Sequence, residues 1–397
     1  MALIEKIKQL ANANHKTVVS NRRHIHQHPE LSFNEFETQK FVETELKKIG
    51  ITDIQQLANT GVVAIIKSTN NPDKKTIALR GDMDALPITE ENKTEYVSQN
   101  IGVMHACGHD VHTSSLLGVA EILFALRNEF EGTIKLIFQP GEEKLPGGAS
   151  LMIKEGVLKN PEVRSVFGQH VMPFLPVGKV GFRGGLYMAS TDELYVKVKG
   201  KGGHGAMPHL NIDPVLIAAN IITSLQQIVS RKANPTIPSV LSFGKVIANG
   251  ATNVIPDEVL MEGTFRTLDE TWRSIAHTEM KKIAEMIAES MGGKCEFEIR
   301  KGYPFLKNDI ELTARAKKYA EEYLGIENVV DLDIWMAAED FSYFTQELPA
   351  CFYRLGTRNE ARGIISSVHT PTFDIDEQAL EIGAGLMAWI AVSELTA

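Results

Sequence analysis

The sequence predicts an α/β fold in which a mixed, mostly parallel sheet is flanked by helices and a second, α+β domain is inserted into the chain. Apolar runs alternate with helical patterns over the first 185 residues, and strictly alternating strands follow from about residue 186. The length of 397 residues exceeds the roughly 250–300 at which a single hydrophobic core stops growing. Two domains are therefore expected.

The chain opens with an amphipathic helical segment that leads into a histidine-rich stretch before Pro29. Because proline restricts the residue before it, this stretch is predicted to be a helix end followed by a turn. Its histidines, His24, His26 and His28, are expected to be structural or solvated. Residues 34–50 are predicted to form a second helix, which ends at Gly50 because glycine suits a helix C-cap.

Strands and helices alternate beyond residue 60. The predicted strands are short apolar runs, and the predicted helices between the later ones show helical spacing of their apolar residues. This alternation favours a parallel sheet with helices on its faces. The strands are Val62–Lys67, Thr76–Arg80, Thr133–Phe138 and Val163–Gly168, and the helices are Ser114–Asn128 and Ala149–Glu155.

A different pattern begins near residue 186. Glu193–Lys199 alternates apolar and polar side chains strictly, as a half-exposed antiparallel strand does. The following elements complete the order β-α-β-β-α-β of a ferredoxin-like unit. Residues 186–301 are therefore predicted to be an inserted domain, and residues 1–185 and 302–397 to form the other domain. The expected elements are a helix at 213–231, strands near 238–248 and 257–267, a helix near 269–291 and a strand at 294–301.

Composition argues against several classes of function. The net charge of −9 argues against nucleic acid as a partner, because phosphate binding needs a basic face. No window approaches 18 uncharged apolar residues, so no membrane span is expected, and the charged N-terminus does not resemble a signal peptide. The three cysteines are sparse and widely spaced, which fits a reducing compartment. The cytoplasm is the expected location.

The densest cluster of metal-binding side chains is the segment 105–112, His-Ala-Cys-Gly-His-Asp-Val-His. Three imidazoles, a thiol and a carboxylate fall within eight positions, a density that no packed core requires. Gly108 lets the chain turn sharply, so that Cys107 and His109 can face one point. We interpret this segment as a metal site; the alternative is a polar loop that opens a helix.

Polar side chains also follow three of the predicted strands: Asp82 and Asp84, then Glu142 and Glu143, then His170. In open α/β sheets the ligand site forms at the carboxyl ends of the strands. Scattered polar residues would not all fall at that edge. The positions of these side chains therefore predict one common site.

The adjacent carboxylates at 142 and 143 suit metal-assisted hydrolysis, because one can bind a metal while its neighbour acts as general base. Alone, the pair is also compatible with an acidic surface turn. His170 and His369 are ambiguous in the same way, since a lone histidine in an apolar setting is more often a hydrogen-bonded core residue. Both are ligand candidates because a metal is already indicated nearby.

A glycine-rich loop ends the first strand of the inserted domain, with the sequence Lys199-Gly-Lys-Gly-Gly-His204-Gly-Ala-Met-Pro-His209. It lacks the spacing Gly-x4-Gly-Lys-Ser/Thr of a phosphate-binding loop. Presentation of His204 toward a cleft is the better interpretation, and a plain hairpin tip is the alternative.

Motifs that run in order from about residue 20 to 390 resemble those of the co-catalytic metal amidohydrolases. The subgroup that the chain resembles most holds hippurate hydrolases, plant auxin-conjugate hydrolases and bacterial N-acyl-amino-acid amidohydrolases. This subgroup lies within the wider aminoacylase and glutamate-carboxypeptidase family. The segments that carry the resemblance are Gly81–Pro87, His105–His112, Gln139–Glu143, Gly203–His209, Asn253–Pro256 and Ala338–Phe341.

The resemblance implies two divalent metal ions about 3.5–4 Å apart, with Glu142 as general base and Asp84 orienting a ligand histidine. The wider family has a histidine at the position of Asp82 and a bridging aspartate about where Cys107 stands, and this chain departs from that pattern as the subgroup does. Sulfur is a soft ligand that suits zinc. Members of the subgroup are also associated with manganese, cobalt or nickel. The implied ligands are Cys107, His109, Glu143, His170 and His369.

The same resemblance implies a substrate and a partner. The substrate would be a small N-acyl amino acid, cleaved to a carboxylic acid and a free amino acid. In the family's dimers, the histidine matching His204 reaches from the partner's inserted domain to support the oxyanion. Asn253 and Arg266 match positions that bind the free carboxylate of the substrate, for which a guanidinium is well suited. A homodimer or tetramer is therefore expected to form through an inserted domain that closes over the substrate.

Two other functions stay in consideration, and the roles of Glu339 and Asp340 stay open. A dipeptidase or carboxypeptidase would use the same scaffold, but the peptidase branches usually carry aspartate where Cys107 stands. A non-catalytic metal-binding protein would predict a missing base or ligand. Glu142 and all five ligand candidates are present.

Overall fold

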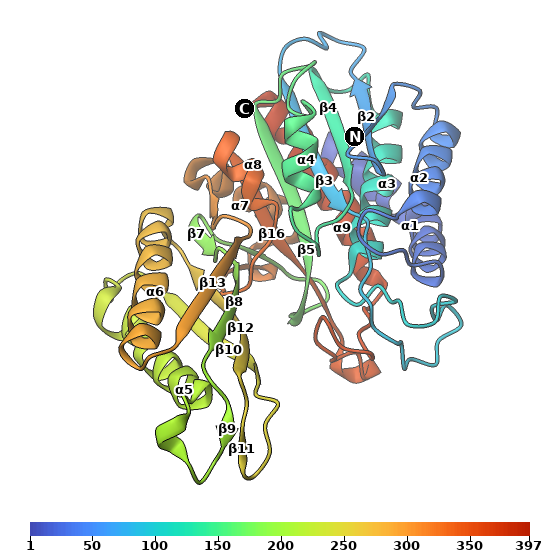
Figure 1. The fold of residues 1–397 in the computed structure, drawn as a ribbon. Coiled ribbons are helices and arrows are strands. Elements are labelled where there is room, and N and C mark those ends of the chain that lie inside the picture. The colour runs from blue at the N-terminus through green and yellow to red at the C-terminus, as the bar shows by residue number, and fades with distance from the viewer. The chain divides into compact units, whose positions relative to one another are not determined.

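The computed structural model describes all residues from 1 to 397. The chain divides into two compact units, each with its own hydrophobic core. The first unit consists of segments from both ends of the chain, and the second consists mainly of its middle (Figure 1). Residues 302–306 and 334–339, which are predicted above to belong to the first domain, group with the second unit. The first unit comprises Met1–Gly185, Lys307–Asp333 and Asp340–Ala397, and the second comprises Leu186–Leu306 and Ile334–Glu339.

An eight-stranded sheet in the order β1-β2-β4-β3-β5-β16-β6-β15 forms the centre of the first unit. The central strands β4, β3, β5 and β16 pair in parallel. The pairs β1–β2, β2–β4 and β16–β6 are antiparallel, so the predicted mixed, mostly parallel sheet is confirmed. The strands are β1 Ile54–Leu57, β2 Gly61–Lys67, β3 Thr76–Asp82, β4 Thr133–Gln139, β5 Ser165–Pro176, β6 Val180–Phe182, β15 Val329–Asp331 and β16 Ala350–Arg358.

Helices cover this sheet, and α1, α3 and α9 pack against one another (Figure 1). Every residue of β3 and β4 is buried, as expected for strands that are covered on both faces. A site can therefore form only beyond the covered part of these strands, from the polar residues at and after their carboxyl ends. The helices are α1 Leu3–Gln27, α2 Phe36–Ile49, α3 His109–Ala125, α4 Gly148–Lys154, α7 Ile310–Leu324, α8 Ser342–Glu347 and α9 Gln378–Thr396.

The C-terminal helix α9 is long and apolar enough to cross a membrane, by length and composition only. However, 78% of its apolar window is buried inside the protein. It packs against α1, α3 and α7. Its place in the core of the first unit therefore accounts for its composition.

The second unit is a four-stranded antiparallel sheet with two long helices. Its strands lie in the order β10-β12-β8-β13, which is the order of a ferredoxin-like unit with these connections. The short strands β9 and β11, which are distant in sequence, pair antiparallel and extend from it. The elements are β8 Asp192–Lys199, β9 Gly203–His204, α5 Pro214–Leu225, β10 Ser239–Ile247, β11 Val254–Ile255, β12 Glu258–Thr267, α6 Glu270–Ser290 and β13 Lys294–Lys301. A separate two-stranded sheet consists of β7 Gly185–Met188 and β14 Leu306–Asn308.

Some elements differ in extent or direction from the sequence prediction. The strand predicted at Val163–Gly168 is the longer β5, so His170 lies within the strand and not after it. Helix α3 begins at His109 instead of Ser114, because Gly108 already turns the chain. Strand β2 runs antiparallel to β4, since an apolar run does not encode the direction in which a strand pairs. These differences move two candidate ligands into regular elements, which fixes their backbone.

Candidate metal centre

The metal-binding segment turns into helix α3 at its glycine. Gly108 adopts a φ of +83°, and a Cβ at this position would lie 2.5 Å from a methyl group of Val171. A side chain would therefore be strained by both the backbone and the neighbouring strand. Cys107 stands just before the helix and His109 in its first turn, and both are buried.

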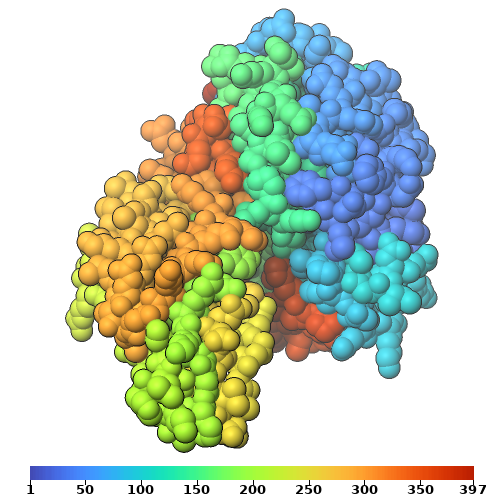
Figure 2. Space-filling view, in the orientation of Figure 1, coloured from blue at the N-terminus to red at the C-terminus, as the bar shows by residue number.

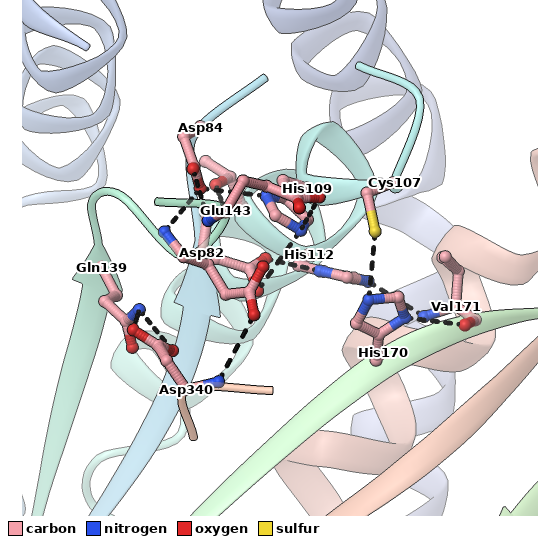
Figure 3. A network of polar contacts seen from close by, with 12 residues as sticks. Asp82, Asp84, Cys107, His109, His112, Gln139, Glu143, His170, Val171 and Asp340 are labelled. Carbon is pink, nitrogen blue, oxygen red and sulfur yellow. Dashed lines mark hydrogen bonds and ion pairs between the residues drawn. The ribbon is translucent and has the colours of Figure 1, made fainter. Parts of the chain in front are cut away.

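Cys107 belongs to two groups of metal-binding side chains. Its Sγ lies 3.5 Å from His170 Nε2 and 3.3 Å from His369 Nε2. His109 completes the first group with Cys107 and His170, and Glu143 completes the second with Cys107 and His369. The ligand atoms of each group lie within 4.8 Å of one another. Figure 3 shows the Cys107 sulfur pointing at the ring of His170. The structure thus brings together all five residues that the sequence singled out as ligands.

The donor atoms of this cluster fit divalent metal ions. His109 Nε2 is buried and makes no hydrogen bond. Buried polar atoms are nearly always satisfied, so each orphaned atom requires an explanation. Glu143 Oε1 lies 3.2 Å from His369 Nε2 and 4.0 Å from His109 Nε2. Thiolate, imidazole and carboxylate are the ligands that zinc and neighbouring transition metals take in proteins.

Two histidines of the cluster, His109 and His369, have raised pKa values, whereas burial holds the pKa of His170 well below its usual range. Contacts with Cys107 and Glu143 raise the pKa of His369 to about 10. Burial, together with the charge of Glu143, raises the pKa of the Cys107 thiol. Burial opposes the charged form of His109, but Asp82 and Asp84 raise its pKa well above the usual range. Because metals bind these groups in deprotonated form, binding at this cluster must release protons.

His369 has an unusual backbone. Its φ of +62° lies in the left-handed region, which residues other than glycine seldom adopt. Its N–H donates to the carbonyl of Ala106 at 2.7 Å. This hydrogen bond ties His369 to the loop that carries Cys107. Strained backbone of this kind is typical of functional sites.

Asp84 connects three members of the cluster. Its Oδ1 lies 3.1 Å from His109 Nδ1 and accepts the N–H of Glu142 at 3.0 Å, while its Oδ2 accepts the N–H of Glu143 at 2.9 Å. A hydrogen bond at Nδ1 leaves Nε2 of His109 to face the other ligand candidates. These are the contacts that the orienting role predicted for Asp84 requires (Figure 3).

Asp82 and His112 form a separate buried pair beside the cluster. Asp82 Oδ1 lies 2.6 Å from His112 Nδ1, and Arg80 donates to Asp82 Oδ2 at 2.5 Å. His112 Nε2 accepts the N–H of Val171 at 2.9 Å, so both nitrogens of this ring are engaged. Burial opposes the charge of Asp82, but Arg80 and the nearby histidines hold its pKa well below the usual range. This pair therefore fixes the strand that carries the neighbouring His170.

Glu142, the predicted base, is 7% exposed and lies with His109 and Glu143 in a third group of potential ligands. Its Oε1 accepts the N–H of Asp340 at 3.3 Å. The carboxylate of Asp340 in turn accepts hydrogen bonds from Arg80, Gln139 and the backbone of Ala149. Asp340, whose role the sequence left open, thus joins the segment after β4 to strand β3.

A buried ion network behind the cluster was not found from the sequence. Arg22 donates to Asp110 Oδ2 at 2.7 Å, and His26 Nδ1 lies 2.8 Å from the same oxygen. His26 Nε2 lies 3.1 Å from Glu90. Arg22 and His26 are spaced i,i+4 on one face of α1, and this spacing was the only feature of the sequence that could have indicated the network. Of the three histidines near the end of α1, His26 is the fully buried one.

The remaining predicted site residues belong to the second unit. His204 lies in β9 and Asn253 directly precedes its partner strand β11. Both residues are exposed, and the Gly205 N–H donates to the Asn253 carbonyl at 2.8 Å. This pair of strands projects from the second unit (Figure 2). Arg266 is half-buried on β12, and burial lowers its pKa.

Comparison with known proteins decides the family. The family model described as peptidase family M20/M25/M40 matches residues 78–392. The chain belongs to this family.

Similar proteins in this family include enzymes of two kinds. Thermostable carboxypeptidase 2 of Saccharolobus solfataricus is 39% identical over 394 residues, which cover 99% of each chain. N-acetylcysteine deacetylase of Bacillus subtilis is 39% identical over 380 residues, which cover 95% of this chain and 97% of that one. The crystal structure of the Bacillus subtilis YXEP protein, described as a dinuclear metal-binding peptidase, is 36% identical with a TM-score of 0.82 and covers 97% of this chain and 99% of that chain.

Membership of the M20 family establishes the class of the protein. It is a hydrolase of the amidohydrolase and peptidase type with the α/β fold of that family. The family includes dinuclear metal-binding members, and the cluster around Cys107 is the candidate dinuclear centre of this chain.

Proposed function

We propose that this M20 hydrolase cleaves the amide bond of N-acyl amino acids, releasing a carboxylic acid and a free amino acid. The observation that carries the proposal is the pair of side-chain groups that share Cys107, with Glu142 beside them. A thiol at the shared position resembles the amidohydrolase subgroup, whereas the peptidase branches usually carry aspartate. The similarity to N-acetylcysteine deacetylase supports the same substrate class.

The proposed metal ligands are the five side chains of the cluster, and two divalent ions supply Lewis acidity when bound. Zinc, manganese, cobalt and nickel are the candidates, because sulfur, nitrogen and oxygen donors are all present. The hydrogen bonds from Asp84 hold His109 and the backbone of Glu142 and Glu143 in place for this role.

Glu142 is proposed to move the proton. Its carboxylate accepts a proton from the attacking water and then delivers it to the nitrogen of the leaving amine. The Asp340 N–H at Oε1 helps to fix the orientation of the carboxylate. Because Glu142 is nearly buried, bulk water does not compete strongly for this proton.

The second unit is proposed to recognise the substrate and a second copy of the chain. Asn253 and Arg266 would bind the free carboxylate of the amino acid, for which a guanidinium offers parallel donors. His204 of the partner subunit would stabilise the oxyanion. We infer a homodimer, or a tetramer built from it, that functions in the cytoplasm without nucleic-acid or membrane partners.

A peptidase function is the second candidate, because a carboxypeptidase of the same family is 39% identical over nearly the whole chain. Both reactions hydrolyse an amide bond next to a free carboxylate. They differ in the group on the other side of that bond, which is an acyl group in one case and an aminoacyl group in the other.

Amino-acid release by chelator-stripped protein, reloaded in turn with zinc, manganese, cobalt or nickel, tests the proposal. The substrates are N-acetyl, N-benzoyl and long-chain N-acyl amino acids beside several dipeptides. We expect metal-dependent release from the acyl amino acids. Release from dipeptides alone would assign the protein to the peptidase branch, and no release with any metal would contradict both functions.

A further inference from the structure

Glu35 is a buried acid that the proposed mechanism does not use. It precedes the first residue of α2 and is fully buried, with 0% exposure. An acid is seldom buried in this way without a specific set of hydrogen-bond donors. Its contacts lead directly to the segment that carries Glu142.

Both carboxylate oxygens of Glu35 are engaged. Oε1 accepts the N–H of Phe33 at 2.9 Å and the N–H of Gly141 at 2.8 Å, and Oε2 accepts the Thr60 hydroxyl at 2.5 Å. Gly141 lies 106 positions away in the sequence and immediately precedes Glu142. Glu35 therefore links the start of α2 to the turn between β1 and β2 and to the segment after β4.

Three successive backbone N–H groups of residues 141–143 donate to two buried carboxylates. The first donates to Glu35, and the next two donate to Asp84. Ser32, three positions before Glu35, donates to Asp84 Oδ2 at 2.6 Å, so the same segment also holds the second carboxylate. These hydrogen bonds hold the backbone of Glu142 and leave its side chain free of this role.

The packing at Gly141 restricts the segment further. Gly141 has a φ of +58°, and a Cβ there would lie 2.4 Å from the ring of Phe33. The chain therefore passes over Phe33 in a backbone conformation that suits glycine. Residues 32–35 therefore restrict the backbone of residues 141–143, which are called the catalytic segment below.

We propose that Glu35 is a positioning residue that holds the backbone at Gly141 and thereby aims Glu142 at the substrate. This inference rests on the proposed role of Glu142 as general base. Displacement of a catalytic group by about 1 Å can reduce turnover by about a hundredfold, so a support outside the metal cluster can matter as much as a ligand.

Glutamine tests the hydrogen bonds separately from the charge. Burial, and then the charge of Asp84, raise the pKa of Glu35 to about 7. A glutamine amide can accept the Gly141 N–H through its oxygen and donate to Thr60 through its nitrogen. Glu35→Gln should therefore retain the support, whereas Glu35→Ala leaves the Gly141 N–H and the Thr60 hydroxyl without partners.

The charge difference gives a separate check on Glu35→Gln. A carboxyl whose pKa is raised in the folded state binds more protons there than in the unfolded chain, so Glu35 lowers stability as pH rises from about 4.5 through about 7. Asp84 is the charged group that faces it. Removing the charge should raise the melting temperature more at about pH 8 than at about pH 5.

The matched control is Glu30→Ala. Glu30 belongs to the same segment, and its carboxylate accepts the N–H groups of Glu37 and Thr38 in the first turn of α2. It makes no hydrogen bond to residues 139–143. Loss of Glu30 should weaken the start of α2 without changing the catalytic segment.

The experiment compares kcat, KM, metal content and hydrogen–deuterium exchange of a peptide covering residues 139–147 in the metal-loaded full-length variants. For Glu35→Ala we expect a fall in kcat of about tenfold or more, a KM within about threefold and unchanged metal content. Exchange in the peptide should be faster. Glu35→Gln and Glu30→Ala should both resemble the wild type in these readouts. If Glu35→Ala does not fold, Glu35→Asp, shorter by one methylene, replaces it.

The proposal would be overturned if Glu35→Ala exchanges residues 139–147 at the wild-type rate and keeps its kcat within about twofold of the wild-type value. An equal loss of kcat in Glu30→Ala would overturn it as well, because the effect would then be general. If the wild type cleaves dipeptides only, the substrate proposal fails and the same comparison is made with a dipeptide. If the wild type cleaves no amide at all, the proposed function fails, and the exchange of the 139–147 peptide still decides whether Glu35 holds the segment.

Discussion

Adjacent residues of this chain are placed in different roles by their surroundings. Glu142 and Glu143 follow the same strand, and Asp84 accepts the backbone N–H of each. The Glu143 carboxylate lies beside His369, while the Glu142 carboxylate accepts the N–H of Asp340. The first arrangement suits a metal ligand and the second suits a group that moves a proton. The difference comes from which distant segments meet each side chain.

This difference predicts that two alanine substitutions, which both reduce activity, have different effects on metal content. Glu142→Ala should retain metal and lose turnover by about 10²–10⁴-fold, because general acid–base catalysis contributes about that much. Glu143→Ala should lose metal as well as activity. Metal analysis of the purified variants beside kcat measurements makes the comparison. Near-full turnover by Glu142→Ala would remove it from the role of base.

The elements of the first unit deliver the site from several directions. Strands β3 and β4 end at Asp82 and Gln139, so Asp84 and Glu142 follow their carboxyl ends. Helix α3 begins with His109, and strand β5 carries His170 within its length. Helix α1 adds no ligand, but Arg22 joins it to Asp110 in the first turn of α3. The first turn of α3 is therefore held by a helix that precedes it by many residues.

The link between α1 and α3 predicts a large loss of stability. The side chains of Arg22 and Asp110 are both fully buried. Removing one partner of a buried ion pair costs about 3–5 kcal/mol, because the other charge stays buried and uncompensated. We expect Arg22→Met to lower the free energy of unfolding by that amount, measured by urea denaturation of the metal-free protein.

The neighbouring Arg23 provides the control. It pairs with Glu377, and its side chain is 39% exposed. Exposed ion pairs are worth only about 0–1 kcal/mol, so Arg23→Met should have a small effect. Equal destabilisation by the two substitutions would show that the buried network is not what supports α3.

At the scale of the whole molecule, the two units carry different parts of the proposed machinery. All five ligand candidates, Glu142 and Asp84 belong to the first unit. The other three site residues, His204, Asn253 and Arg266, belong to the second unit. Each unit has its own hydrophobic core. Metal binding should therefore be insensitive to substitutions in the second unit, while turnover should depend on them.

Mixing of subunits tests whether His204 acts on the partner's site. His204→Ala alone should lower kcat with unchanged metal content. Dissociated and reassociated mixtures of His204→Ala with Glu142→Ala should regain activity, because one site of each mixed dimer then has both residues. A histidine that acts within its own subunit leaves both sites of the mixed dimer defective. Unaltered kinetics of His204→Ala would remove this residue from the oxyanion role.

Local patterns determined much of the candidate site. The turn at Gly108 and the polar residues after β3 and β4 depend on backbone rules that act over a few residues. The alternation of strands and helices likewise predicted the mixed, mostly parallel sheet, and the motifs in order predicted the family. The extent of β5 and the direction of β2 were predicted less well, because an apolar run does not encode its pairing partner.

Only the tertiary structure decided which distant side chains meet. His369 reaches Cys107 across 262 positions, and Glu35 reaches Gly141 across 106. Among the histidines near the end of α1, the packing of that helix buries His26 and leaves His24 exposed. Sequence by itself determined the chemical types available and the local turns that present them. Burial and long-range contact decided their use, because both depend on how the whole chain packs.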